Sequence, residues 1–388
     1  MTDINEKADL LGMTPDEIAE FLGTLGEPKY RAAQIFGWMH RGVGIAEMTN
    51  LPKKLRVTLQ EKAFVDFPTV ERKLVSKLDG TIKYLFGLSD GNVIESVFMR
   101  YKHGNTICVS SEVGCAMGCR FCASTIGGLV RRLRAAELIG QVIAAEKDTG
   151  ERISNIVMMG IGEPLDNFDN TVRFLKLVGD PGGLNIGSRH ISVSTCGLVD
   201  RINELAKLDL QITLSISLHA ADDETRSSIM PVNRKWGIDE LLAACRGYFA
   251  ATGRRISFEY TLISGKNDSV SDAAKLAGVL KRGLYRGSEP FPIHVNLIPV
   301  NEVEETGFKK SGADAVNRFA AELEKRGVRA TVRRKLGSDI NASCGQLRRA
   351  KIKEDAALNG IEASPASDAE AMMDTDAEAS PEQARKRH

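Results

Sequence analysis

From about residue 105 onward, the chain alternates between short apolar strands and amphipathic helices. We expect strands at 106–111, 155–160, 190–195, 211–217, 256–263 and 293–300. The helices are expected at 135–147, 170–178, 198–208, 238–249, 271–282 and 313–326. Apolar strands that alternate with covering helices require a parallel sheet. Six such units are too few for a closed eightfold barrel, so the pattern predicts an α/β fold, a partial (β/α)6 barrel. Its chemistry is expected at the carboxyl ends of the strands.

Two segments precede this core and one follows it. Residues 1–65 contain three short amphipathic stretches, which predict a small N-terminal helical domain. This domain resembles an RNA-binding accessory domain. Residues 66–100 are rich in β-forming residues and contain two Asp-Gly turns, which is typical of a hairpin connector. The catalytic core is then expected over 101–353. Residues 354–388 lack aromatic side chains and cannot bury enough surface to offset their ordering entropy, so we predict a disordered acidic tail.

The charge of the chain is distributed unevenly. Residues 354–388 contain nine acidic and three basic residues, which leaves residues 1–353 with a formal net charge of +7 in a chain of net charge +1. A basic body favours a polyanionic partner. No stretch approaches the roughly 20 apolar residues needed to span a bilayer. The charged N-terminus is also unlike a signal peptide, so we expect a cytoplasmic protein without membrane contact.

Three of the seven cysteines form a C-x3-C-x2-C motif, namely Cys115, Cys119 and Cys122, on the loop after the first core strand. Clustered cysteines in a reducing compartment indicate metal binding or catalysis. Structural zinc sites use four protein ligands, and no second C-x2-C pair completes one here. Three thiolates instead suit a [4Fe–4S] cluster with one open iron. A zinc site or a group of buried cysteines remains the alternative.

The motif resembles the cluster motif of the radical S-adenosylmethionine (SAM) superfamily. This resemblance implies that the methionine part of SAM binds the open iron and that one-electron reduction cleaves the cofactor. The sequence Gly-Ile-Gly-Glu-Pro at 160–164 resembles the element that holds the methionine amino group, which assigns Gly162 and Glu163 to the cofactor. The same resemblance assigns further contacts to residues at later strand ends: Ser194, Ser217, Leu218, His219 and Asn296.

Longer stretches resemble one family, the dual-specificity adenine-C2 RNA methyltransferases of bacteria, over roughly residues 10–353. These stretches are CVSSEVGCAMGCRFCAST (108–125), ISLHA (216–220), RSSIMPVNR (226–234), NLIPVN (296–301) and GSDINASCGQL (337–347). The resemblance implies methylation of C2 of a specific adenine in 23S rRNA and of adenine 37 in tRNAs. It also implies two SAM molecules per turnover, one to methylate Cys344 and one to generate the radical that activates this methyl group.

The resemblance assigns roles to three further residues. Cys344 becomes the S-methylcysteine intermediate, and Glu95 accepts the C2 proton. Cys108 forms a transient disulfide with Cys344 to release the product. The implied partners are 23S rRNA, tRNA and an electron donor such as flavodoxin, and we expect a monomer. Basic groups that could hold RNA phosphates occur at 131–134, 333–335 and 348–351.

Three alternative functions remain open. A sister methyltransferase that acts on adenine C8 of 23S rRNA shares the cysteines and the mechanism, although residues 123–130 look more like the C2 family. A non-catalytic iron–sulfur RNA-binding protein would not produce 5′-deoxyadenosine from SAM. A radical enzyme that modifies peptides is disfavoured by the basic body and by the single cluster motif.

Overall fold

The structure is a computed structural model, and it describes residues 7–285, 291–302, 306–334, 336–340 and 345–358. Its centre is a ten-stranded sheet with the order β14-β13-β12-β11-β10-β9-β6-β5-β4-β3. Within this sheet, the seven neighbouring strands β14, β13, β12, β11, β10, β9 and β6 are parallel. They are β6 (Thr106–Cys108), β9 (Asn155–Met158), β10 (Ile191–Thr195), β11 (Thr213–Ser217), β12 (Ile256–Leu262), β13 (His294–Pro299) and β14 (Arg329–Val332). The predicted partial barrel is therefore confirmed, and β14 extends it by one strand.

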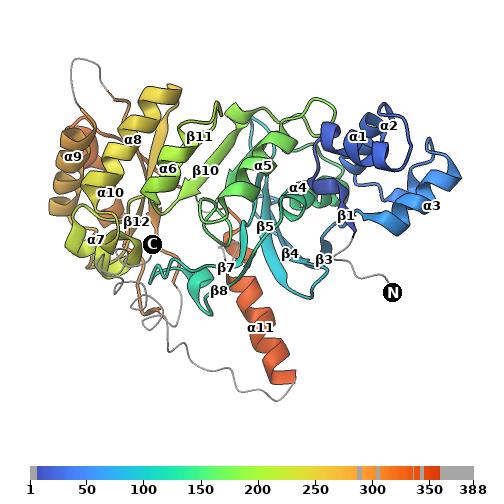
Figure 1. The fold of residues 1–388 in the computed structure, drawn as a ribbon. Helices are drawn as coiled ribbons and strands as arrows, with labels where there is room; N and C mark the ends of the chain where they lie inside the picture. The colour runs from blue at the N-terminus through green and yellow to red at the C-terminus, as the bar shows by residue number, and fades with distance from the viewer. Residues whose placement is uncertain (1–6, 286–290, 303–305, 335, 341–344, 359–388) are drawn as a thin grey trace, which may run out of the picture.

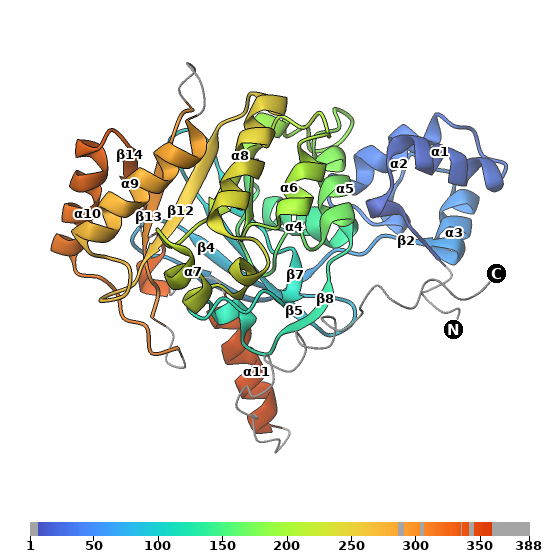
Figure 2. The ribbon, with the colours of Figure 1, turned by 60° about the vertical axis from the view of Figure 1, so that its left-hand side comes forward.

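Helices cover one face of this parallel sheet, as Figure 2 shows. They are α4 (Ala135–Thr149), α5 (Phe168–Val178), α6 (Val199–Leu205), α8 (Ile238–Thr252), α9 (Val270–Leu284) and α10 (Ala313–Lys325). Helix α4 ends where Gly150 adopts a left-handed conformation, with φ of 68°. A shorter helix, α7 (Asp223–Ile229), follows β11, and the Asp222 side chain caps it by accepting the Thr225 N–H.

The antiparallel strands β3 (Thr69–Val75), β4 (Ile82–Gly87) and β5 (Val93–Met99) continue the sheet directly from β6. Side chains alternate between the two faces of a strand. On one face, Ser96 bonds to Gln141 of α4 at 2.8 Å. The opposite face carries Glu95, and helix α11 (Gln346–Leu358) packs against β5 and extends away from the body (Figure 1). The extension of the sheet thus brings the C-terminal helix over the strands that precede the barrel.

The N-terminal lobe contains α1 (Pro15–Thr24), α2 (Arg31–Met39) and α3 (Lys53–Lys62) (Figure 1). Thr14 begins α1 with a capping box, in which its side chain and that of Glu17 satisfy each other's backbone N–H groups. The short parallel strands β1 (Ala8–Asp9) and β2 (Ala63–Phe64) bring the two ends of the lobe together. Ion pairs from Arg173 to Glu17 and from Arg134 to Asp9 join the lobe to the core.

Several elements were not expected from the sequence. The hairpin of β7 (Glu112–Gly114) and β8 (Leu129–Arg132) flanks the cysteine motif. Helix α11 continues to Leu358, so it enters the stretch assigned to the acidic tail, and residues 359–388 lie outside the described residues. No helix within the described ranges has the length and apolar character needed to cross a membrane. The remaining short 3-10 helices are η2 (Leu10–Gly12), η3 (Ile45–Glu47), η4 (Ala123–Thr125), η5 (Ser188–His190), η6 (Pro231–Arg234) and η8 (Ser338–Ile340).

Candidate active site

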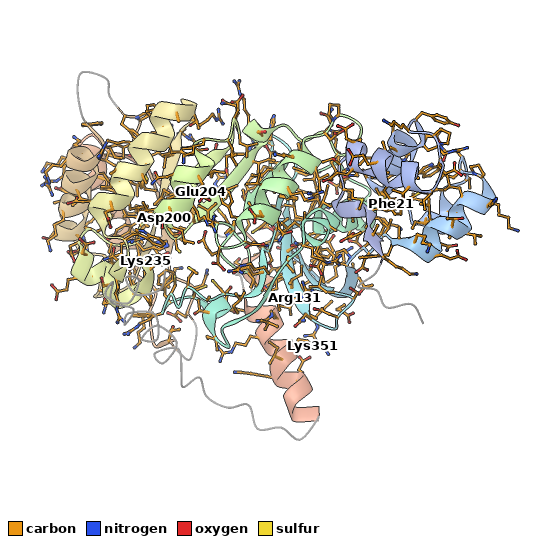
Figure 3. All side chains as sticks on the ribbon, in the orientation of Figure 1. Phe21, Arg131, Asp200, Glu204, Lys235 and Lys351 are labelled. Atoms are coloured by element: carbon orange, nitrogen blue, oxygen red, sulfur yellow. The ribbon has the colours of Figure 1, made fainter. Side chains whose placement is uncertain are left out.

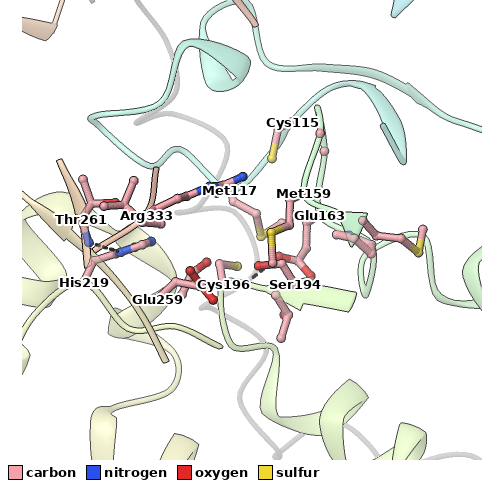
Figure 4. Close-up of a pocket in the computed structure, with 17 residues that line it drawn as sticks. Cys115, Met117, Met159, Glu163, Ser194, Cys196, His219, Glu259, Thr261 and Arg333 are labelled. Atoms are coloured by element: carbon pink, nitrogen blue, oxygen red, sulfur yellow. Dashed lines mark hydrogen bonds between the residues drawn. The ribbon is translucent and has the colours of Figure 1, made fainter. Parts of the chain in front are cut away.

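A cavity of about 210 Å³ lies at the carboxyl ends of the parallel strands. Figure 4 shows that the cysteine loop contributes Cys115 and Met117 to its wall, and that strand ends supply the other labelled side chains. The lining includes Gly162, Glu163, Ser194, Cys196, Ser217, His219, Glu259, Thr261 and Arg333. This is the edge of the sheet at which the sequence predicts the chemistry.

The cysteine loop is held at its base by the β7–β8 hairpin. The Cys115 N–H donates to the Gly128 carbonyl at 3.0 Å. Gly114, with φ of 83°, lies so close to this carbonyl that a Cβ on it would be 2.0 Å from the Gly128 oxygen. Only glycine fits at this position, because the backbone conformation and the space both exclude a side chain.

The far side of the cysteine loop rests on the segment that follows β11. The Arg120 N–H donates to the Ile229 carbonyl at 2.9 Å. A Cβ on Gly118 would lie 3.4 Å from the Pro231 ring. Inside the loop, the Thr125 hydroxyl donates to the Cys122 carbonyl at 2.9 Å. The loop is therefore fixed at both ends and across its middle.

The three cysteine thiols fit an iron–sulfur cluster. Cys115 and Cys119 are buried, and Cys122 is partly exposed. Burial, reinforced by the neighbouring thiols, raises the pKa of both Cys115 and Cys119, so a cation is needed to hold them as thiolates. Among the described residues, no three His, Cys, Asp or Glu side chains are grouped closely enough to hold a single metal ion. Three thiolates without a fourth protein ligand suit a [4Fe–4S] cluster that keeps one iron open.

The loop after β9 forms the neighbouring wall and is packed without spare room. Gly162 has φ of 103°, and a Cβ there would lie 2.6 Å from the Glu112 Cβ. Glu163 accepts the Cys196 N–H at 2.7 Å and the Leu165 N–H at 3.0 Å. Burial raises the pKa of Glu163, and these backbone bonds oppose the effect. The carboxylate is thus fixed in direction at the cavity, beside Ser194 (Figure 4).

His219 lines the opposite side of the cavity in a left-handed conformation, with φ of 56°. Its Nδ1 accepts the Thr261 N–H at 2.9 Å, which leaves the proton on Nε2. Burial, and secondarily the charge of Arg226, lowers the pKa of His219 to about 3. His219 is therefore a neutral donor at physiological pH, held in a strained conformation of the kind found at functional sites.

Two of the predicted cofactor residues do not line the cavity themselves. The Leu218 side chain is fully buried, and its N–H donates to the Glu259 carbonyl at 3.0 Å. Asn296 donates from Nδ2 to Glu259 Oε2 at 2.8 Å. Glu259 lines the cavity, so both residues adjoin the site through Glu259. Gly162, Glu163, Ser194, Ser217 and His219 line it directly.

Glu95 and Cys108 lie on the sheet face that α11 covers. Cys108 is buried beside Val97 and Met99, with Met159 and Leu336 packed against this group. Glu95 is also buried, and it accepts backbone N–H groups from Gly345 at 2.8 Å and from Arg348 at 2.6 Å. Lys83 lies 3.1 Å from the same carboxylate. Met159 lies in both the cavity wall and the group around Cys108, so this face is continuous with the cavity.

Cys344 lies outside the described residues, but its neighbour is placed. A Cβ on Gly345 would lie 3.0 Å from the backbone nitrogen of Ser124, two residues after the last cluster cysteine. Gly345 therefore lies between Glu95 and the end of the cysteine loop. Residues far apart in the sequence converge here: Glu95, Cys108, the cysteine loop and the beginning of α11.

Sequence reasoning missed some residues and misjudged others. Glu259, Met159 and Arg333 line the cavity. Met159 and Arg333 directly follow strands, which could have indicated this, whereas Glu259 lies within β12. The basic run after the cysteine loop is engaged within the protein. Arg131 pairs with Asp90 and Glu137, Arg132 pairs with Asp166, and Arg134 pairs with Asp9. These arginines help to fix the hairpin, which makes them poorer candidates for phosphate ligands than expected.

Comparisons with known proteins agree with this geometry. The family model of the radical SAM superfamily matches residues 109–277, and that of the ribosomal RNA large subunit methyltransferase N-terminal domain matches residues 8–65. A "probable dual-specificity RNA methyltransferase RlmN" of Alkaliphilus oremlandii is 54% identical, covering 90% of this chain and 99% of the relative. The protein of the same description from Clostridium perfringens strain 13 is 52% identical, covering 89% of this chain and 98% of the relative.

A solved structure extends this similarity to three dimensions. The crystal structure of a radical SAM methyltransferase from Sphaerobacter thermophilus has a TM-score of 0.82 and 45% identity with this chain. The match covers 87% of this chain and 98% of the other. Both the N-terminal lobe and the barrel therefore have counterparts in known proteins.

Proposed function

This chain belongs to the RlmN family of dual-specificity RNA methyltransferases in the radical SAM superfamily, and on that premise we propose that it methylates C2 of adenine in RNA. The proposed targets are a specific adenine of 23S rRNA and adenine 37 of tRNAs. One observation supports this proposal most strongly: Glu95 is bonded to Gly345, the residue after Cys344, on the face that also holds Cys108. Glu95, Cys108 and the residue that follows Cys344 thus come from one region of the fold.

Membership of the superfamily implies a [4Fe–4S] cluster and SAM. Bound at Cys115, Cys119 and Cys122, the cluster would supply the electron that cleaves SAM. We propose two SAM molecules per turnover, one as methyl donor and one as radical source. Glu163 would accept hydrogen bonds from the methionine ammonium group, because its carboxylate is fixed at the cavity wall. The cofactor would also contact Gly162, Ser194, Ser217, His219, the Leu218 backbone and Asn296.

The chemistry of the target explains why a cysteine is needed. C2 of adenine is electron-poor, so it cannot displace a methyl group from a sulfonium. We propose that the Cys344 thiolate accepts the methyl group first, which is an ordinary displacement at sulfur. The radical derived from the second SAM would remove one hydrogen from this methyl group, and the resulting carbon radical adds to C2. Glu95 then accepts the C2 proton. Cys108 attacks the Cys344 sulfur and forms a transient disulfide; the electron pair of the broken sulfur–carbon bond takes up a proton to complete the methyl group, and the remaining electron of the adduct would return to the cluster.

The RNA would approach from the side where the cysteine hairpin and α11 lie. Lys235 and Lys351, labelled in Figure 3, lie along this side of the molecule. Arg333 and Arg334 are exposed, and Arg333 also lines the cavity. Because base chemistry requires an unstacked nucleotide, the target adenine would enter the cavity extruded from the RNA.

We further propose a monomer that acts in the cytoplasm and receives electrons from a donor such as flavodoxin.

The proposal is tested by nucleoside analysis. The protein, reconstituted anaerobically, is incubated with SAM, a reductant and either unmodified 23S rRNA or tRNA, and the digested nucleosides are separated by mass spectrometry. The expected product is 2-methyladenosine from both RNAs, with 5′-deoxyadenosine formed alongside. Formation of 8-methyladenosine would replace C2 by C8 as the target. Absence of both 5′-deoxyadenosine and methylated adenosine would favour a non-catalytic RNA-binding protein.

A further inference from the structure

Arg226 on α7 is the largest fully buried side chain of the described residues, with no solvent exposure. Its guanidinium donates to the carbonyl groups of Cys196 at 2.6 Å, Leu218 at 3.1 Å and Ser217 at 3.2 Å. It also donates to the Asn233 side-chain oxygen at 2.8 Å. The hydrogen-bonding needs of the group are thus met, but by neutral acceptors.

No Asp or Glu within the described part of the chain forms an ion pair with Arg226, and among carboxylates only the charge of Asp223 acts on it from nearby. Asp223 is nearby on the same helix, but its Oδ1 accepts from Asn233 at 3.0 Å and from the Ile238 N–H at 2.9 Å. Burying a charge is costly unless an opposite charge accompanies it. Burial accordingly lowers the pKa of Arg226 from that of a free arginine.

The position of α7 indicates where the opposite charge belongs. The end of this helix carries the cysteine loop, through the bond from the Arg120 N–H to the Ile229 carbonyl at 2.9 Å. Gly118, the residue before Cys119, packs against Pro231 just after this helix, where a Cβ on Gly118 would lie 3.4 Å from the proline ring. Arg226 also bonds to the carbonyl of Cys196, a residue of the cavity wall. The Arg226 guanidinium therefore lies next to the cavity wall, on the helix that supports the cysteine loop.

We propose that Arg226 is the buried counter-charge of the iron–sulfur cluster and that it raises the reduction potential of the cluster. This inference rests on the proposed function, because it requires the cluster. Three thiolates give the cluster a net negative charge, and reduction adds one more. A fixed cation in a dry environment stabilises the reduced state more than the oxidised state. The arrangement would make the first electron easier to accept from a weak donor.

A purely structural role would also explain the bonds around Arg226, since they join the ends of β10 and β11. Two substitutions separate the effect of the positive charge of Arg226 from the effect of its hydrogen bonds. Arg226→Lys keeps the charge and loses part of the bonding, whereas Arg226→Gln loses the charge. Arg254→Gln is the matched control, because Arg254 donates to the Ile212 carbonyl at 3.4 Å at the opposite end of the β11 segment.

The test is an anaerobic redox titration of each reconstituted variant, followed by the EPR signal of the reduced cluster and normalised to bound iron. We expect Arg226→Gln to shift the midpoint potential to a more negative value, and the Lys and Arg254→Gln variants to stay near the unsubstituted protein. An unshifted potential in Arg226→Gln, or an equal shift in Arg226→Lys, would overturn the inference. If Arg226→Gln binds no cluster, Arg226→Met replaces it as the uncharged variant: a negative shift that Arg226→Lys does not show supports a charge effect, and an unshifted potential refutes it.

This titration distinguishes the inference from the proposed function. It involves no RNA and no turnover. If the unsubstituted protein holds no iron–sulfur cluster, the proposed function fails. If the variants hold the cluster and their potentials do not depend on the charge at position 226, only the role of Arg226 fails.

Discussion

The Glu95 carboxylate accepts the backbone N–H of Gly345 at 2.8 Å, although the two residues are 250 positions apart in the sequence. The other carboxylate oxygen accepts the Arg348 N–H at 2.6 Å, which satisfies donors at the beginning of α11. One buried side chain of β5 thus fixes Gly345 and the beginning of α11, directly after Cys344 in the sequence. In the proposed reaction, the same carboxylate accepts the C2 proton.

Glu95→Gln should reduce RNA methylation by about 10²- to 10⁴-fold, the range typical of removing a general base. The amide keeps one of the two acceptor oxygens, so one of the two backbone bonds is lost and Lys83 loses its carboxylate partner. Methylation is therefore normalised to the amount of folded protein. The expected signature is accumulation of a covalent protein–RNA species on a denaturing gel, because the adduct forms but does not lose its proton. Glu71→Gln, an exposed position on β3, is the control. Normal methylation by Glu95→Gln would remove this residue from the mechanism.

Lys83→Met should destabilise the protein by about 3–5 kcal/mol, because it leaves the buried Glu95 carboxylate without its cation. The pair is 3.1 Å apart and both side chains are almost completely buried. Adding Glu95→Gln to Lys83→Met should recover part of the loss, since the unpaired charge is then gone. Urea unfolding of the two single variants and the double variant measures this coupling. Additive effects would show that the ion pair contributes little.

Gly162→Ala should abolish SAM binding, because the new Cβ would meet Glu112 at 2.6 Å and displace the loop that carries Glu163. Gly127→Ala separates this clash from backbone strain. Gly127 also has a positive φ, 88°, but nothing lies within 4 Å of its Cβ position. The control should therefore cost only about 1–3 kcal/mol of stability, from its conformation alone. Equilibrium dialysis with labelled SAM provides the comparison, and equal losses in both variants would contradict the packing argument.

His40 should make the protein less stable at mildly acidic pH. Its Nδ1 accepts the Leu184 N–H at 3.2 Å, and burial lowers its pKa to about 4. In the unfolded chain the pKa of His40 is near 6.5, so as the pH falls His40 becomes protonated in the unfolded chain while it stays neutral in the folded protein. Between pH 7 and pH 5 this should remove about 2 kcal/mol from the free energy of unfolding. His219, with a pKa of about 3, adds a loss of the same sign.

The variant His40→Gln isolates this contribution. Denaturant unfolding at pH 7 and pH 5 should show a smaller fall in stability for the variant than for the unsubstituted protein. The same fall in both proteins would mean that His40 is protonated in the folded state.

The order of the barrel could be predicted from the sequence, because each core strand is a short apolar run and each helix has an apolar face. The six expected strands occur as neighbours in the expected order. The Asp-Gly turns at 79–80 and 90–91 likewise indicated the strands β3, β4 and β5. Local sequence patterns were sufficient to predict a helix or a strand wherever the segment's own residues determine its structure.

Long-range pairings could not be predicted in this way. The bond between Glu95 and Gly345 and the ion pair between Lys83 and Glu95 depend on how the antiparallel strands continue the barrel. Arg226 occurs in a stretch that family resemblance identifies, but only its complete burial without a carboxylate partner suggests an electrostatic role. The ion pairs of Arg131, Arg132 and Arg134 show the converse, since a basic run in the sequence became part of the scaffold.

The account depends above all on three thiolates that hold a [4Fe–4S] cluster with an iron open to SAM. EPR spectroscopy of the anaerobically reduced protein, recorded before and after addition of SAM, tests this most directly. We predict the signal of a reduced [4Fe–4S] cluster that changes shape when SAM binds, and loss of that signal in Cys115→Ala. A protein that binds zinc at these cysteines, or a cluster whose spectrum SAM leaves unchanged, would contradict the account.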